Sequence, residues 1–227
     1  HILRINEEEI GDLIDFQVHS SDPLLHIVVE RASELYDLRV ERIAGETMGL
    51  AFEEMPLRRC DNKCVFCFLH QMPSGMRRSL YFEDDDYRLS FLYGNFTTLT
   101  RFTEADLERV LSEGLSPLYV SIHATDPDKR TEMLRNRRGA TSLRWLRALL
   151  DHGITVHGQV VVCPGLNDGL WLEDTLAGAA DRFPELASIC VVPLGVSRYT
   201  DEVRMRAHTS DEACAVVDVV EAWQAHL

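Results

Sequence analysis

Three cysteines stand close together in the sequence with the spacing of metal ligands. Cys60, Cys64 and Cys67 form a C-x3-C-x2-C pattern in a run that also holds Arg, Asp, Asn and Lys. A four-iron cluster normally takes four cysteines, so three thiolates would leave one iron without a protein ligand. An open coordination position is typical of catalytic rather than structural metal centres. The spacing therefore predicts a metal centre that can bind a small molecule.

Zinc is the alternative interpretation of the same residues. Cys60, Cys64 and Cys67 together with His70 would supply a Cys3His tetrahedron. A chain with such a site would be a binding or scaffold protein. A third alternative is a cluster-bearing electron carrier or sensor that carries out no chemistry on a small molecule. The spacing favours the cluster and leaves all three open.

The other three cysteines, Cys163, Cys190 and Cys214, are scattered singly through the chain. Free cysteine is often buried, so we expect them to be core residues. A close trio without paired partners fits a reducing cytoplasm.

We expect no membrane partner, because no apolar run approaches the roughly 18 residues needed to cross a bilayer and no signal peptide is evident. Since the chain begins with His1 and not Met, we interpret it as a processed form or a fragment.

The net charge of −14, from 23 basic and 37 acidic residues, disfavours broad affinity for nucleic acids or anionic membranes. One stretch is locally basic and is interpreted as solvated helix faces. Its members are Lys129, Arg130, Arg135, Arg137, Arg138, Arg144 and Arg147. A nucleic-acid partner is therefore disfavoured but stays open.

The elements that must position the cysteines differ between the two parts of the chain. Residues 1–54 predict a small mixed α+β module. It has strand-like runs at 2–5, 25–29, 38–43 and 48–52 and a helical pattern at 8–16.

Residues 55–227 predict an α/β fold, and the apolar content of 45% is enough for a core. Strands are expected at 89–93, 118–123, 154–162 and 189–194. Helices between them would begin at the caps Thr103, Asp126 and Ser210, and Ala213, Val216, Val217 and Val220 would face inward on the last one. Repeated strand–helix units imply a parallel sheet. Four or five units are too few for a closed eight-stranded barrel, so a partial barrel is expected.

The predicted order of strands and helices also predicts where the three cysteines lie in the fold. A first strand ending at 57–59 would lead directly into them. Ligands of parallel α/β folds bind at the carboxyl ends of the strands. The predicted metal centre would thus lie at the mouth of the partial barrel, which favours the cluster over zinc.

The cysteine pattern resembles the radical S-adenosylmethionine (SAM) superfamily, with Phe66 in the position of the aromatic residue that lies against the adenine. The resemblance implies a 4Fe-4S cluster and SAM as cofactors. It also implies one-electron cleavage of SAM to a 5′-deoxyadenosyl radical, which abstracts hydrogen from a substrate, here unknown. A reductant such as flavodoxin or ferredoxin would be a partner.

Longer runs resemble the DUF512 family of bacterial Fe–S oxidoreductases. They lie at 59–68, 71–81, 84–95, 116–125, 163–169 and 192–195. The resemblance implies that residues 1–54 are part of a PDZ-like module and that residues 55–227 form the radical SAM partial barrel. It also implies that the C-terminal domain that gives the family its name is missing or truncated.

The resemblance also implies cofactor contacts. Gly94 and Asn95, at the end of the expected second strand, would meet the amino group of SAM. Gln159 would contact its ribose or carboxylate, with His157 on the same face of the strand. Ser121 is expected to contact SAM or the substrate.

Two residues are candidates for catalysis. His123 shares a strand face with Ser121 and would point into the barrel. Asp85 stands at the centre of the acidic run 84–86, between the cysteines and the expected second strand. Arg77, Arg78 and Arg88 are the arginines that could pair with this run or bind the SAM carboxylate.

Overall fold

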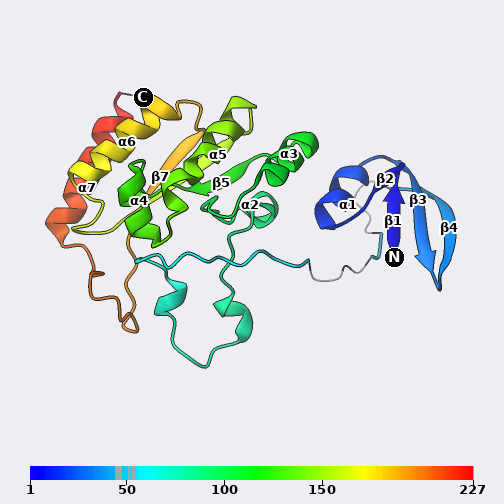
Figure 1. The fold of residues 1–227 in the computed structure, drawn as a ribbon, viewed down its shortest axis with the longest axis horizontal. Helices are drawn as coiled ribbons and strands as arrows, with labels where there is room; N and C mark the ends of the chain where they lie inside the picture. The colour runs from blue at the N-terminus through cyan, green and yellow to red at the C-terminus, as the bar shows by residue number, and fades with distance from the viewer. Residues whose placement is uncertain (44–47, 51, 53–54, 227) are drawn as a thin grey trace. The chain divides into compact units, whose positions relative to one another are not determined.

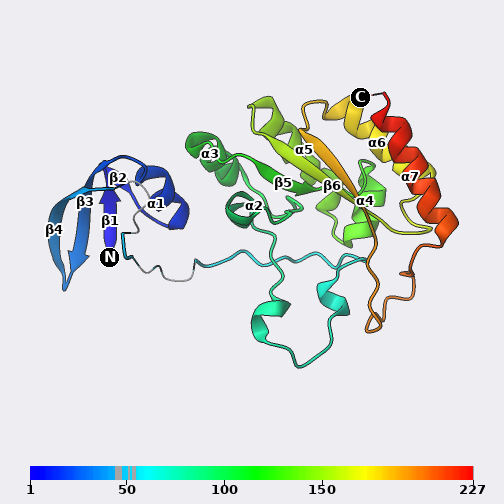
Figure 2. The ribbon, with the colours of Figure 1, turned by 180° about the vertical axis from the view of Figure 1, so that it is seen from behind.

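The computed structural model describes residues 1–43, 48–50, 52 and 55–226 (Figures 1 and 2). The chain divides into two compact units, His1–Leu57 and Arg58–Leu227. The domain boundary expected after residue 54 adjoins positions outside the described residues. Among the described residues, no helix is long and apolar enough to cross a membrane.

The first unit is a small antiparallel sheet with one helix. Its elements are β1 (Ile2–Ile5), β2 (Glu8–Glu9), α1 (Leu13–His19), β3 (Leu24–Arg31) and β4 (Glu34–Glu41). The strand order is β2-β1-β3-β4, and every neighbouring pair is antiparallel. Ile5, Leu25 and Ile27 form the centre of its core. The expected α+β composition is therefore present.

Two expectations for this unit were wrong in detail. The helix predicted at 8–16 starts later, because Asp12 caps it by accepting hydrogen bonds from the N–H groups of Ile14 and Asp15. Residues 8–9 pair with β1 instead. The strand predicted at 48–52 is absent from residues 48–50 and 52, and residue 51 is outside the described residues.

The second unit is a parallel α/β layer preceded by a long loop region. It contains η1 (Leu69–Gln71), η2 (Arg78–Tyr81), α2 (Tyr87–Tyr93), α3 (Glu104–Glu113), β5 (Leu118–Ser121), α4 (Pro127–Leu134), α5 (Gly139–Asp151), β6 (Val156–Val162), α6 (Leu170–Arg182), β7 (Ser188–Pro193) and α7 (Ser210–Gln224). Strands β5, β6 and β7 form one parallel sheet in that order. The predicted mixed α/β fold with a parallel sheet is confirmed. Within the described residues this sheet has three strands, fewer than the four or five units expected.

The prediction of a strand at 89–93 was wrong, because this segment is part of helix α2. Asp86 caps its first turn by accepting from Arg88 N, and Gly94 ends it in the left-handed conformation (φ 74°). A short apolar run can form either a strand or a buried helix, and here the two capping residues favour the helix. The strand expected to end at 57–59 is reduced to one bridge between Arg59 and Asp84.

The two faces of the parallel sheet differ. Val160 and Val162 pack against Leu172 and Leu176 of α6, and α7 adds Val216, Val219 and Trp223 (Figures 1 and 2). Because neighbouring residues of a strand point to opposite faces, Ser121 and Gln159 lie on the other face. The cap of α7 is Thr209 and not Ser210. Ala213 and Val217 are exposed, so these two were wrongly assigned to the inner face of this helix.

Candidate functional site

The cysteine loop, residues 59–68, lies at the carboxyl ends of the parallel strands. Val65 packs in one buried cluster with Ala124, Cys163 and Leu194. These three residues follow the ends of β5, β6 and β7 respectively. The cysteine loop therefore sits at the sheet edge where α/β folds bind their ligands.

Main-chain hydrogen bonds hold the cysteine loop on two sides. At its base, Cys60 N donates to Glu83 O at 2.9 Å, and Asp85 N donates to Arg58 O at 3.2 Å. Further along, Lys63 N and Val65 N each donate at 3.0 Å to a carbonyl of the last turn of α4. The position of the three cysteines thus depends on main-chain geometry.

The thiols are free, half-buried and electrostatically coupled. Burial raises the pKa of Cys60 to about 11, although hydrogen bonds from Asn62 act in the opposite direction. Burial also raises the pKa of Cys64 strongly, and the nearby sulfurs of Cys60 and Cys67 add to the effect. Cys60 and Cys64 therefore keep their protons at neutral pH until a cationic centre replaces them.

Zinc and an iron–sulfur cluster require different spacings of the donor atoms. In the described part of the chain, no three His, Cys, Asp or Glu side chains are close enough to hold one metal ion. Tetrahedral zinc would bring its sulfurs to about 3.8 Å from one another. A cubane spaces them more widely, because each thiolate binds a different iron. His70, the expected fourth zinc ligand, places Nε2 3.2 Å from Glu83 Oε1.

A cavity of about 260 Å³ opens beside the cysteines. Its lining residues are mostly polar: Cys64, Val65, Cys67, His70, Gln71, Arg135, Thr200, Asp201 and Glu202. The segment after β7 is fixed here, since Ser197 N donates to Gln71 Oε1 at 2.9 Å and Glu202 pairs with Arg135. This cavity could hold a small polar ligand next to two of the three thiols.

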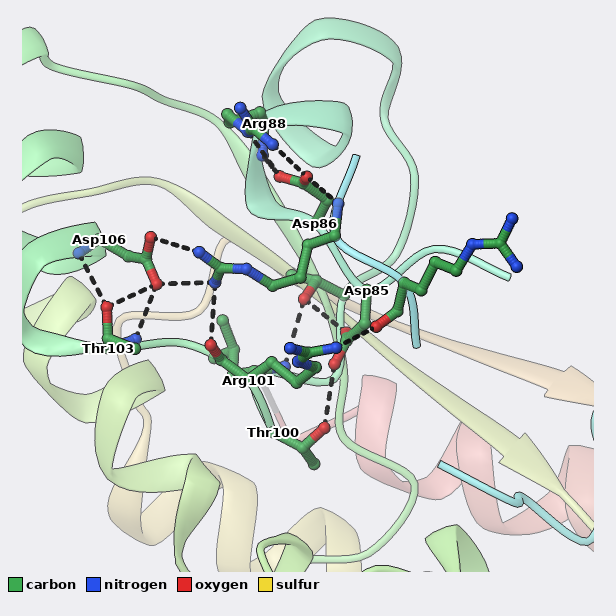
Figure 3. Close-up of polar contacts among 11 residues, drawn as sticks. Asp85, Asp86, Arg88, Thr100, Arg101, Thr103 and Asp106 are labelled. Carbon is green, nitrogen blue, oxygen red and sulfur yellow. Dashed lines mark hydrogen bonds and ion pairs between the residues drawn. The ribbon is translucent and has the colours of Figure 1, made fainter. Parts of the chain in front are cut away.

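The three aspartates of the run 84–86 have separate partners. Asp85 is 3% exposed and accepts hydrogen bonds from the hydroxyls of Thr97, Thr98 and Thr100 at 2.8 to 3.0 Å. Asp86 pairs with Arg88, and Figure 3 shows this pair together with the hydrogen bond between Asp85 and Thr100. Burial acts to raise the pKa of Asp86, but hydrogen bonds from Arg88 and from Arg58 N hold this pKa below its usual value.

Asp84 differs from its two neighbours. It is half-buried, and burial raises its pKa. Asn95 Nδ2 donates to its Oδ2 at 3.3 Å, so Asn95 lies beside the acidic run. Gly94 stands at the end of α2 and not, as expected, at the end of a strand. A side chain at Gly94 would approach the ring of Tyr119 at 3.6 Å.

His123 is almost fully buried, directly beyond β5. Its Nδ1 accepts a hydrogen bond from Val161 N at 3.2 Å, so the neutral ring carries its proton on Nε2. The ring packs edge-on against Phe66, with centroids 4.5 Å apart. Burial lowers the pKa of His123 to about 3. The structure therefore joins two predicted site residues, Phe66 and His123, in one contact.

Ser121 and Gln159 are also brought together. They are direct neighbours in the register of β5 and β6, and Cys190 of β7 continues the row. In the adjacent row, the rings of Tyr119 and His157 stack with centroids 5.2 Å apart. This sheet face therefore presents polar groups near the cysteine loop.

Three expectations about other side chains need correction. Cys163 is buried as expected, but Cys190 and Cys214 are exposed and are not core residues. Arg130 is fully buried and does not lie on a solvated helix face. Other members of the basic stretch pair with carboxylates, namely Lys129, Arg135, Arg138, Arg144 and Arg147.

Two polar residues of the site were missed from the sequence. Asn62 is 2% exposed, and its Nδ2 lies 3.3 Å from Cys60 Sγ. Arg130 donates five hydrogen bonds to neutral acceptors. The sequence did contain a signal that Arg130 is buried. It precedes Met133 by three residues and Leu134 by four, so it lies on the apolar stripe of α4.

Comparisons with known proteins place this geometry in context. The family model described as a radical SAM-like domain matches residues 42–189, more than half of the 227 residues. Among solved structures, the chain is similar to a radical SAM methyltransferase from Sphaerobacter thermophilus, with 21% identity and a TM-score of 0.41. That match covers 56% of this chain and 37% of the other, so the chain matches little more than a third of that protein. No curated protein matches the chain.

Proposed function

The chain belongs to the radical SAM-like domain family, and on this premise we propose that it is an enzyme that holds a 4Fe-4S cluster and cleaves SAM. The observation that carries the proposal is the position of the cysteine loop. Val65 packs against the residues that follow all three parallel strands, and a cavity lies beside Cys64 and Cys67. A reactive centre belongs at this edge of the fold.

The residues that would hold the cluster are Cys60, Cys64 and Cys67, one thiolate for each of three irons. When bound, the cluster and SAM would supply one-electron chemistry that begins hydrogen abstraction from a substrate. The chain's own part is to bind and orient. Phe66 packs against the buried residues around Val65 and would offer an apolar ring beside the cysteines.

The polar sheet face would bind SAM or the substrate. Ser121 and Gln159 are adjacent there, and neutral His123 would donate from Nε2 without exchanging protons near pH 7. Gly94 and Asn95 would approach SAM from the end of α2. Asp85 would act through the threonines it orders, because hydrogen bonds from their hydroxyls already engage its carboxylate.

The finer family and fold assignments are part of the same proposal. The three parallel strands with helices on one face support a partial barrel. The antiparallel sheet and helix of the first unit support a PDZ-like module. Together with the longer sequence runs, these features support membership of the DUF512 family and a cytoplasmic iron–sulfur oxidoreductase with a flavodoxin or ferredoxin as reductant. A nucleic-acid partner is less favoured, because the basic stretch is largely paired.

The experiment is anaerobic reconstitution of the intact protein with iron and sulfide, followed by SAM and dithionite. We expect about four irons per chain and release of 5′-deoxyadenosine, measured by mass spectrometry. Cys64→Ala should abolish the product. Cys214→Ala, at an exposed cysteine of α7, is the matched control for cluster content.

Each contrary result has a definite meaning. One zinc per chain without visible absorbance would support the zinc-stabilised binding or scaffold protein. A stable cluster that binds no SAM would support an electron carrier or sensor. Either result would overturn the proposed activity.

A further inference from the structure

A buried amide group donates to the sulfur of one cysteine of the loop. Asn62 Nδ2 lies 3.3 Å from Cys60 Sγ and also donates to Thr98 Oγ1 at 2.9 Å. The amide group of this one residue therefore bridges the sulfur and the threonine hydroxyl.

The orientation of the amide is fixed by its other partners. Asn62 Oδ1 accepts from Asn136 Nδ2 at 2.7 Å, and Thr100 Oγ1 lies 3.1 Å from the same oxygen. A flipped amide would turn its NH2 group toward the amide donor of Asn136 and its oxygen toward the sulfur. Thr98 and Thr100 are in turn held by the buried carboxylate of Asp85. The donor is thus pre-positioned by a closed polar network.

A buried positive charge lies on the other side of this network. Arg130 is fully buried, and its Nη2 donates to Thr98 O at 2.9 Å. Its other hydrogen bonds go to the carbonyls of Ile122, Gly139 and Ser121 and to the Ser142 hydroxyl. No carboxylate of the described residues forms an ion pair with it, and Asp85 acts on it only through longer-range electrostatic attraction. A cation without a direct counterion favours negative charge nearby.

We propose that Asn62 is a positioning residue that hydrogen-bonds the Cys60 thiolate and raises the reduction potential of the cluster. This inference rests on the proposed function, because it requires a cluster on the three cysteines. Hydrogen bonds to cluster sulfurs are a known determinant of potential. They favour the reduced state, since it carries one more negative charge.

The test is a redox titration of the reconstituted protein, followed by electron paramagnetic resonance. Asn62→Ala removes the side-chain donor without adding charge. We expect the one-electron equilibrium to shift at least tenfold toward the oxidised cluster, which is about 59 mV. Asn62→Leu is similar in size and carries neither a donor nor a charge, so it should shift the equilibrium in the same direction. This second variant decides the question if the alanine variant does not fold.

Ser112→Ala is the control, because it removes an exposed hydroxyl of α3 that lies outside this network. We expect its potential to stay within twofold of the wild-type equilibrium. A wild-type potential in the Asn62 variants, or an equal shift in Ser112→Ala, would overturn the inference and leave the proposed function intact. A wild-type chain that takes up no cluster would overturn both.

Discussion

Burial determines what His123 can contribute. Its Nδ1 accepts the hydrogen bond of Val161 N, and its ring lies against Phe66. With a pKa lowered to about 3, the imidazole is neutral throughout the physiological range. His123 can therefore donate one hydrogen bond from Nε2, but it cannot exchange a proton with a substrate near pH 7.

This burial predicts a pH dependence of stability. Between pH 3 and about 6.5 the unfolded state binds a proton at His123 that the folded state does not, so the free energy of unfolding falls as the pH is lowered through this window. We expect this difference in proton binding at His123 to lower the free energy of unfolding by about 2 kcal/mol between pH 7 and pH 5. Urea unfolding at both pH values should show this loss in the wild type and not in His123→Gln.

The control for this comparison is His152→Gln, at an exposed position of the same unit. It should keep the pH dependence of the wild type. Nuclear magnetic resonance offers a direct check, because the His123 ring signal should not titrate between pH 5 and 8. A titration near pH 6.5 would contradict the buried, neutral ring.

At the level of elements, helix α4 supports the cysteine loop. Its last carbonyls, those of Met133 and Leu134, accept hydrogen bonds from Val65 N and Lys63 N. Its first turn is capped by Asp126, whose Oδ1 accepts from Lys129 N at 2.8 Å. A change at one end of this helix therefore affects the support at the other end.

Asp126→Ala should lower the free energy of unfolding by about 1 kcal/mol, because an N-cap hydrogen bond is lost. Asp128→Ala, in the same first turn but exposed, should cost at most about 0.5 kcal/mol. Chemical denaturation of both variants measures the difference. Equal losses would show that the cap makes no specific contribution.

Capping residues also explain how much of the secondary structure could be predicted. Thr103 and Asp126 were identified correctly, since a cap followed by an apolar stripe is a local signal. Helix α2 was missed although Asp86 and Gly94 mark its two ends. In a run of seven residues, apolar content alone does not separate a strand from a buried helix.

Across the whole molecule, the two units have separate cores. Ile5, Leu25 and Ile27 lie at the centre of the first, whereas the clusters around Val65 and Val160 belong to the second. Each core is made from residues of its own unit. Each unit should therefore respond to core substitutions by itself.

Leu25→Ala tests this separation. Leu25 is fully buried, so we expect the variant to lose about 2 to 5 kcal/mol of opening free energy in β3 and β4. Leu24→Ala, at the adjacent and 57% exposed position, is the matched control and should change little. Hydrogen exchange measures both, with residues 58–226 as the internal reference. An equal loss of protection in that reference would contradict separate cores.

The candidate site combines a local sequence pattern with contacts between residues that are far apart in the chain. The spacing of Cys60, Cys64 and Cys67 is local and could be read directly. The hydrogen bond from Asn62 to Cys60 depends on Thr98, Thr100 and Asn136, which are 36 to 74 residues away in the chain. Such a network arises only when distant loops fold together, so residue types alone could not predict it.

The base of the cysteine loop has a consequence for how the protein would mature. It is closed by main-chain hydrogen bonds from Cys60 to Glu83 and from Asp85 to Arg58, which require no metal. In zinc fingers, by contrast, metal binding itself drives folding. The proposed cluster would therefore be inserted into a loop whose base is already held by the main chain.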